Sequence, residues 1–167
     1  MTDKIVNQRK SEMVKQEVKI DDFDLLKLPL LSCLSEQEIA IVRERCDACS
    51  FDPGEIILKR GELDKSVYFM TYGCAHVLNY SSSGRAVTYA SASRGEMFGE
   101  MAAIDGLPRS AWVCAISDCK LIRIREETFM SFVKNNSTFA ISVLQKLSSN
   151  IRELVKRLIN ILSLGAE

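Results

Sequence analysis

The residues best suited to chemistry are concentrated between Gly95 and Trp112. In this stretch two glycines precede Glu100, and a Gly-x-Pro break directly precedes Arg109, nine positions after Glu100. A glycine before a helix lets backbone N–H groups approach an anion closely. Arg109 offers a planar fork that can hold two oxygens of one phosphate, and ionised Glu100 only accepts hydrogen bonds, which suits sugar hydroxyls. These residue types together predict a site for a sugar phosphate.

The same stretch resembles a known motif. Phe98-Gly99-Glu100, followed by Arg109-Ser110-Ala111, is similar to the phosphate-binding cassette of cyclic-nucleotide-binding domains. The run 109–113 is most similar to bacterial regulators of the catabolite-activator type. Loop, acid, helix and arginine occur in order, which favours this interpretation over a simple surface turn between two strands. The spacing of glycines before the cassette extends the resemblance over about residues 25–155.

The resemblance implies a role for each matching residue. Glu100 would bind the ribose 2′-hydroxyl and Arg109 the cyclic phosphate, while backbone amides of the cassette turn would also meet the phosphate. Apolar side chains would form walls around ribose and base. The other residues implied are Gly99, Met101, Ala102 and Ser110 in the cassette, and Val77, Tyr89, Ala90 and Phe98 in the walls.

One position departs from the catabolite-activator pattern. Where those proteins place hydroxyl side chains to read adenine, the long C-terminal helix carries Leu154 and Val155. Base reading would then come from the backbone, from Ser110, or from Arg152 or Arg157 stacking on the purine. The helix residues expected to contact the base or close over it are Leu154, Val155 and Arg157. The expected ligand is cAMP, with cGMP as the alternative, and no separate cofactor is expected.

The bulk composition describes an ordinary globular chain. It has 167 residues, 47% of them hydrophobic, with 22 basic and 22 acidic side chains. This balance gives no global field for nucleic acid, and no run approaches the ~20 apolar residues that span a bilayer. The N-terminus has no apolar secretory segment. We therefore expect a cytoplasmic protein with no direct nucleic-acid partner, no membrane span and no helix-turn-helix after the long helix.

Cysteine and histidine do not predict a metal site. The chain has six cysteines and one histidine, His76, and Cys46-x-x-Cys49 has no second pair. A zinc or iron–sulfur site usually needs four good ligands. Reduced, mostly buried thiols are expected, and the role of the Cys46/Cys49 pair stays open. With no nucleophile–base pair in the sequence, we expect no catalytic residues and no enzyme activity.

Periodicity predicts an α+β chain that is mainly β, an antiparallel β-roll or jelly roll. Residues 1–24 form a polar arm or helix, 25–135 the roll with flanking helices, and 136–167 a long helix. A capping box at Ser35 to Glu38 starts a helix over about 36–46. Expected strands, separated by glycine-rich turns, are 56–58, 67–70, 74–80, 85–93, 111–116 and 120–124. A short helix from 126 ends near Asn136, and Ser137 would cap the long one.

The long helix carries a heptad-like apolar row. Its members, spaced alternately by three and four residues, are Leu144, Leu147, Ile151, Leu154, Leu158 and Ile161. One face packing on a barrel needs less apolar surface than this. We therefore expect a parallel homodimer through residues 140–162, against the alternative of a helix that only covers the barrel.

The function expected is a cyclic-nucleotide sensor that signals through its C-terminal helix to an unidentified effector protein. Two alternatives stay open. The fold could serve as a dimeric scaffold or sense haem, through His76 and Met97, or an organic acid. The chain could also be a fragment of a larger regulator or channel.

Overall fold

The computed structural model describes residues 19, 20 and 25–164. The expected N-terminal arm therefore lies almost entirely outside the described residues, as does the C-terminal tripeptide after Leu164. Within the described part, no helix combines the length and the apolar content needed to cross a membrane.

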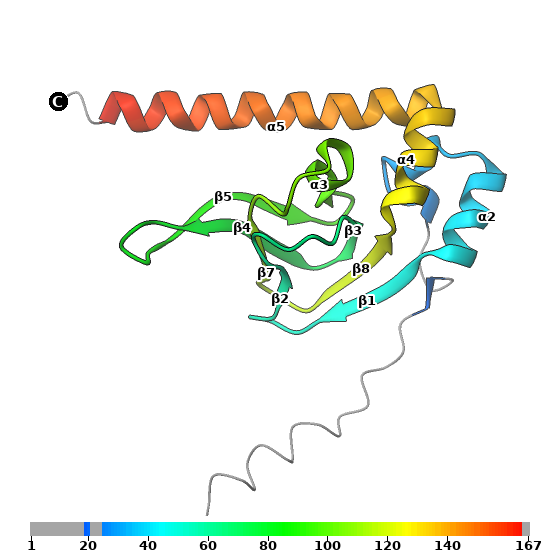
Figure 1. Ribbon diagram of the computed structural model, residues 1–167, viewed down its shortest axis with the longest axis horizontal. Helices are drawn as coiled ribbons and strands as arrows, with labels where there is room; N and C mark the ends of the chain where they lie inside the picture. The colour runs from blue at the N-terminus through cyan, green and yellow to red at the C-terminus, as the bar shows by residue number, and fades with distance from the viewer. Residues whose placement is uncertain (1–18, 21–24, 165–167) are drawn as a thin grey trace, which may run out of the picture.

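Eight strands form the centre of the molecule, as two antiparallel four-stranded sheets (Figure 1). The first sheet has the order β1-β8-β3-β6 and the second the order β2-β7-β4-β5. The strand bounds are β1 Asp47–Phe51, β2 Ile56–Leu58, β3 Val67–Tyr72, β4 Cys74–Tyr80, β5 Ala86–Ser93, β6 Met97–Phe98, β7 Trp112–Ala115 and β8 Cys119–Ile124. The predicted mainly-β roll is confirmed.

The first sheet is buried on both faces, and strand β3 shows why. Along β3, Val67 and Phe69 face the helices, whereas Tyr68 and Met70 face the second sheet. Successive side chains of a strand point to opposite faces, so this continuous apolar run is suited to a strand between two layers. The first sheet therefore lies between two layers, with the helices on one face and the second sheet on the other.

Helices and 3-10 turns gather at one end of the roll (Figure 1). They are η2 Leu25–Lys27, η3 Leu31–Cys33, α2 Glu36–Arg45, α4 Glu126–Asn135 and α5 Ser137–Leu164, while α3 Glu100–Asp105 lies in the cassette. Phe139 of α5 stacks edge-on with Phe129 and Phe132 of α4, at centroid distances of 5.8 and 5.9 Å. This buried cluster fixes the root of α5.

Two details of the prediction were wrong. The strand block begins at Asp47, before the first expected strand at 56–58, because residues 47–51 pair with β8 from Arg123 to Cys119. Asn136, not Ser137, caps α5, since its Oδ1 accepts the N–H of Phe139 at 2.9 Å. The capping box at Ser35 is confirmed, with the Ser35 N–H donating to Glu38 Oε2 at 2.8 Å.

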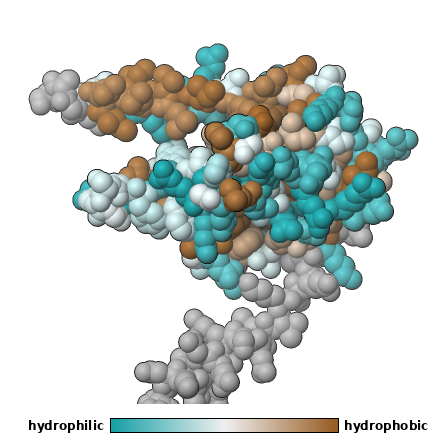
Figure 2. Space-filling view, viewed as in Figure 1, coloured by the Kyte–Doolittle hydropathy of each residue, from teal (hydrophilic) through white to brown (hydrophobic). Residues whose placement is uncertain are grey.

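Helix α5 extends well beyond its root and runs along the roll above the β4–β5 hairpin (Figure 1). Every residue from 148 to 163 is exposed. Figure 2 shows a continuous apolar band along this part of the helix. Its members are Leu144, Ile151, Leu154, Val155, Leu158, Ile159, Ile161 and Leu162, each at least 47% exposed.

Candidate functional site

The cassette turns at Gly99, which precedes α3 in a left-handed conformation with φ +82°. Only glycine adopts this region without strain. A Cβ at Gly99 would lie 2.8 Å from Arg109 Nη1 and 3.1 Å from the carbonyl oxygen of Ser66. The glycine is therefore needed twice, for the backbone turn and for the close approach of the Arg109 side chain.

Arg109 is buried against the cassette, with only 2% of its side chain exposed. Its Nη1 donates to the carbonyl of Gly99 at 2.7 Å. Its Nη2 donates to Asp64 Oδ2 and to the carbonyl of Ser66, both at 2.7 Å. The backbone of Arg109 also pairs with the preceding loop, through Glu62 and Gly61. The guanidinium is thus held in one orientation before any ligand arrives.

These bonds use three of the five N–H donors of the guanidinium. The Nε–H of Arg109 is buried and has no hydrogen-bond partner among the described residues. Leaving a buried donor unsatisfied costs about 1–3 kcal/mol, and more for a charged group. An anionic oxygen in the adjoining cavity, which Arg109 lines, would remove this cost. The arrangement fits an anion.

Asp64 is the carboxylate that balances the charge of Arg109. Burial pushes the pKa of Asp64 upward, but hydrogen bonds from Arg109 and Ser66 outweigh this effect and hold that pKa below its usual value. Half of the Asp64 side chain is exposed. The sequence pattern did not single out Asp64, since it lies 45 residues from Arg109.

Glu100 is the second buried charged group of the cassette. Burial raises the pKa of its carboxyl, partly offset by a hydrogen bond from its own backbone N–H and by the charges of Lys146 and Arg109. A carboxylate held in such surroundings gains from a ligand hydroxyl that donates to it. The predicted anion group and hydroxyl acceptor therefore lie in one cavity.

That cavity has a volume of about 650 Å³ and lies between the second sheet, the cassette and α5. It collects almost every residue predicted for the site. The predicted residues that line it are Val77, Tyr89, Ala90, Phe98, Gly99, Glu100, Met101, Ala102, Arg109, Ser110, Leu154 and Arg157. Val155 and Arg152 are not among the lining residues. Val155 belongs to the exposed apolar band instead, because it follows Leu154 by about 100° around the helix.

Helix α5 presents a polar row to the cavity that the sequence prediction missed. Lys146, Asn150, Glu153 and Arg157 all line it, at successive steps of four, three and four residues. These steps place side chains on one face of a helix. The spacing was visible in the sequence, but the apolar row beside it was the stronger signal.

The two ends of this polar row contact the roll. Lys146 Nζ lies 2.5 Å from Glu96 Oε1, in the turn before β6. Arg157 Nη1 donates to the backbone carbonyl of Tyr89 on β5 at 2.5 Å, and its Nε lies 3.5 Å from Glu153. Arg157 is therefore at the cavity, as predicted, but its guanidinium is already engaged with the sheet.

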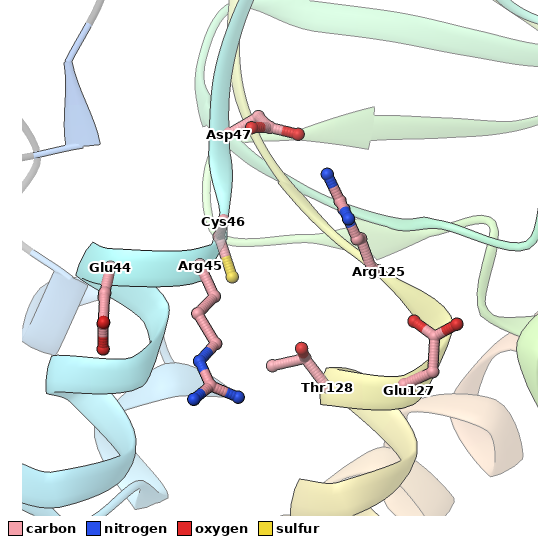
Figure 3. Close-up of a pocket in the computed structure, with 7 residues that line it drawn as sticks. All are labelled: Glu44, Arg45, Cys46, Asp47, Arg125, Glu127 and Thr128. Carbon is pink, nitrogen blue, oxygen red and sulfur yellow. The ribbon is translucent and has the colours of Figure 1, made fainter.

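A second cavity, of about 450 Å³, lies between the end of α2, the start of β1 and the start of α4 (Figure 3). Its lining is mixed in charge, and the exposed groups of Glu44, Arg45, Asp47, Arg125 and Glu127 surround it. The sulfur of Cys46 points toward this space (Figure 3). Burial raises the pKa of Cys46 to about 12, so this thiol is not a nucleophile at neutral pH. The residues around this second cavity therefore do not indicate a binding or catalytic site.

The remaining cysteine and histidine residues do not form a metal centre. Within residues 19, 20 and 25–164, no group of three or more His, Cys, Asp or Glu side chains could hold a metal ion. His76 lies in β4 opposite Cys114 and Ser91. Trp112 lies outside the cavity lining and contacts Tyr80 edge-on at 6.0 Å.

Comparison with protein families agrees with this geometry. The model of the cyclic nucleotide-binding domain matches residues 48–136, which is over half of the chain. The chain belongs to the cyclic nucleotide-binding domain family. The match covers the roll, the cassette and α4, so the buried arginine and carboxylate lie within the family's own domain.

Two of the curated relatives of this cyclic nucleotide-binding domain are a kinase regulatory subunit and a cyclic AMP receptor protein. The chain is 32% identical over 105 residues to a cAMP-dependent protein kinase regulatory subunit of Aspergillus fumigatus, covering 63% of this chain and 25% of that one. It is 25% identical over 125 residues to the cyclic AMP receptor protein of Thermus thermophilus, covering 75% and 58%. The chain thus spans about a quarter of the fungal relatives and little over half of the bacterial one.

Solved structures support the fold of this cyclic nucleotide-binding domain. The catabolite activator protein of Thermus thermophilus gives a TM-score of 0.67 at 24% identity, covering 81% of this chain and 63% of that one. A regulatory subunit of a cAMP-independent protein kinase A from Trypanosoma cruzi, bound to guanosine, gives 0.65 at 21%, covering 85% and 49%. Both likenesses show that this chain has the same fold as those proteins.

Proposed function

We propose that the chain is a regulatory module that binds cAMP in the cavity between the cassette and α5. The observation that carries this is the buried Arg109 guanidinium, with an unpartnered Nε–H beside the cavity. A cyclic phosphate oxygen would satisfy this donor, and the ribose 2′-hydroxyl would donate to Glu100. The backbone of Gly99, Met101 and Ala102 would complete the phosphate contacts at the start of α3.

cAMP is favoured over cGMP by the catabolite-activator-like run at Arg109-Ser110-Ala111 and by the names of the relatives. Those relatives are cAMP-dependent kinase regulatory subunits and a cyclic AMP receptor protein. The base would lie against Tyr89 and Ala90 on the sheet and beneath the polar row of α5. No cofactor and no catalysis are part of the proposal.

The output is proposed to pass through α5. The exposed apolar band would pair with the same band of a second copy, which gives a parallel homodimer, and an effector protein would read the arrangement of the two helices. The band supports this because eight large apolar side chains in contiguous positions are rarely left in water. Cytoplasmic localisation is part of the same proposal.

Calorimetry with cAMP and cGMP tests the ligand. We expect wild type to bind cAMP more tightly than cGMP, and Arg109→Ala to bind cAMP about 100-fold more weakly, since a charged hydrogen bond contributes about 1.5–3 kcal/mol. The matched control is Arg123→Ala, which removes a partly exposed arginine paired with Asp47, away from the cavity. Absence of heat with both nucleotides would refute the proposal.

A further inference from the structure

The free part of α5 is not held on the roll by apolar packing. Buried side chains on this helix end with Val143, and Leu147 is only partly buried. From residue 148 to 163 all side chains are exposed, and of the apolar band only Ile151 and Leu154 are among the residues that line the cavity. Something else must therefore hold the helix over the cavity.

Two polar contacts hold α5 over the cavity, one at each end of the polar row. Lys146 pairs with Glu96, and Arg157 donates to the carbonyl of Tyr89. Their eleven-residue separation corresponds to about three turns, or about 16 Å along the helix. The row members between them, Asn150 and Glu153, line the cavity. The contacts thus bracket the space that a ligand would occupy.

The Glu96 end is built to receive a cation. Its Oε2 accepts the N–H of Ser93 at 2.8 Å and the hydroxyl of Ser93 at 3.1 Å, which leaves Oε1 for Lys146. Its backbone carbonyl accepts the N–H of Met70 on the buried sheet at 2.9 Å. Burial pushes the pKa of Glu96 upward, but the bonds from Lys146 and Ser93 more than offset it, so that pKa is lowered. The carboxylate is charged and fixed in place.

We propose that the Lys146–Glu96 pair is a latch that holds α5 over the cavity, so that ligand entry requires this ion pair to open. Lys146 is then a positioning residue for the binding site. The ligand part of this inference rests on the proposed function, whereas the closed position of α5 does not. Both side chains are about 30% exposed, at 27% and 31%, so salt can screen their attraction.

The first test measures α5 without any ligand. Nitroxide labels are coupled to unnatural amino acids at Ser83, on the hairpin tip, and Asn160, on α5, which leaves the native cysteines in place. Labelled chains are diluted in an excess of unlabelled chain, so that distances between the two copies of the proposed dimer do not contribute. Pulsed electron resonance should then give one narrow distance distribution for wild type and a broad one for Lys146→Met and for Glu96→Gln. Lys146→Arg should restore the narrow one. Lys156→Met, which removes the same charge from an exposed residue outside the cavity lining, should leave it unchanged.

A broad distribution in wild type, or a narrow one in both Lys146→Met and Glu96→Gln, would overturn the latch. Glu96→Gln keeps an acceptor for Ser93, so it separates loss of the ion pair from damage to the turn. The distance measurement needs no bound nucleotide. If the protein binds no nucleotide, the proposed function is refuted, and the distance distributions still test the latch.

The second test measures entry, by stopped-flow mixing with a fluorescent cAMP analogue. The association rate constant should rise several-fold in Lys146→Met and Glu96→Gln relative to Lys156→Met. Added salt should raise it in wild type and lower it in Lys146→Met, because only the wild type has an ion pair to release while screening weakens attraction of the anion in both. Equal association rates in Lys146→Met and Lys156→Met would overturn gating.

Discussion

The guanidinium of Arg109 and the carboxylate of Asp64 are 2.7 Å apart, yet 2% of one side chain is exposed and 50% of the other. The cation is therefore buried while its partner remains hydrated. Such a pair holds the arginine in position without fully neutralising it. Arg109 lines the cavity and its Nε–H has no partner among the described residues, so a ligand anion can add to the pair.

Asp64→Asn should strengthen binding of cAMP several-fold, since the amide keeps an acceptor for Arg109 but removes the negative charge that competes with the phosphate. Unfolding should become easier by about 1 kcal/mol, as expected for loss of a charged hydrogen bond at a half-exposed site. Calorimetry and urea unfolding measure the two effects. Asp47→Asn, a carboxylate paired with Arg123 outside the cavity, is the control. Weaker binding by Asp64→Asn would contradict this account.

Glu100→Gln should weaken nucleotide binding and stabilise the empty protein at neutral pH. Because burial raises the pKa of Glu100 in the folded state, its contribution to stability is full below the unfolded pKa and is lost as pH rises through the folded pKa. Glu100→Gln removes the ionisable group, and with it this loss of stability at neutral pH. Scanning calorimetry should show a melting temperature a few degrees higher at neutral pH, and no difference at acid pH. A melting temperature that is also higher at acid pH would show that the stabilisation does not come from the ionisation of Glu100.

Gly99→Ala should destroy nucleotide binding and cost more stability than the same substitution elsewhere. The new Cβ would lie 2.8 Å from Arg109 Nη1 and would push the guanidinium from its three acceptors. Gly84→Ala is the matched control, because Gly84 has φ +76° but open space around its Cβ position. We expect about 1 kcal/mol from backbone strain alone in the control and a larger loss at Gly99, measured by urea unfolding. Equal losses would show that the contact with Arg109 is unimportant.

Asn136→Ala should destabilise the fold by about 2 kcal/mol, the upper range for loss of a helix cap. Its Oδ1 caps α5 through Phe139, and its Nδ2 donates to the carbonyl of Cys33 and to Glu38. One side chain thus joins α5 to the N-terminal helices. Asn135→Ala removes an amide bonded only to Ser131, one turn earlier, and should cost much less. Similar denaturation midpoints for the two variants would refute the joining role.

Leu158→Glu should convert the proposed dimer into a monomer and leave the thermal stability of the roll unchanged. Leu158 is 56% exposed, in the middle of the apolar band. Analytical ultracentrifugation should give twice the 18.7 kDa chain mass for wild type and the single chain mass for the variant. Lys156→Glu, on the polar side of the same helix, should remain dimeric. A monomeric wild type at micromolar concentration would refute the dimer.

The sequence predicted best where function depends on residues close together in the chain. Glu100 and Arg109 belong to one contiguous cassette, and their residue types alone indicated an anion and a hydroxyl. Asp64 could not be found this way, because its contact with Arg109 depends on how two loops pair. The polar row of α5 was missed for a similar reason. Which face of α5 meets the roll is decided at its root, where Phe139 packs against α4.

The strand prediction likewise succeeded where the local sequence pattern is decisive and failed where tertiary pairing is. Alternating runs such as 85–93 were recognised, while β1 was not, since Asp47–Phe51 contains polar and small residues and is a strand only through its pairing with β8. Val155 was assigned to the cavity by analogy with the catabolite-activator pattern. The rotation of α5 places it in the apolar band instead, because that rotation is a tertiary property.

The unbroken course of α5 has a mechanical consequence. Its 28 residues span about 42 Å, and only its first turns are held by buried apolar side chains. A rigid rod pivoted at one end magnifies small angular changes, so a tilt of about 5° at the root would displace the far end by about 4 Å. Displacement on that scale is comparable to a side chain's width. A change in one hydrogen-bonded pair near the root of α5 would therefore produce a larger displacement at its C-terminal end.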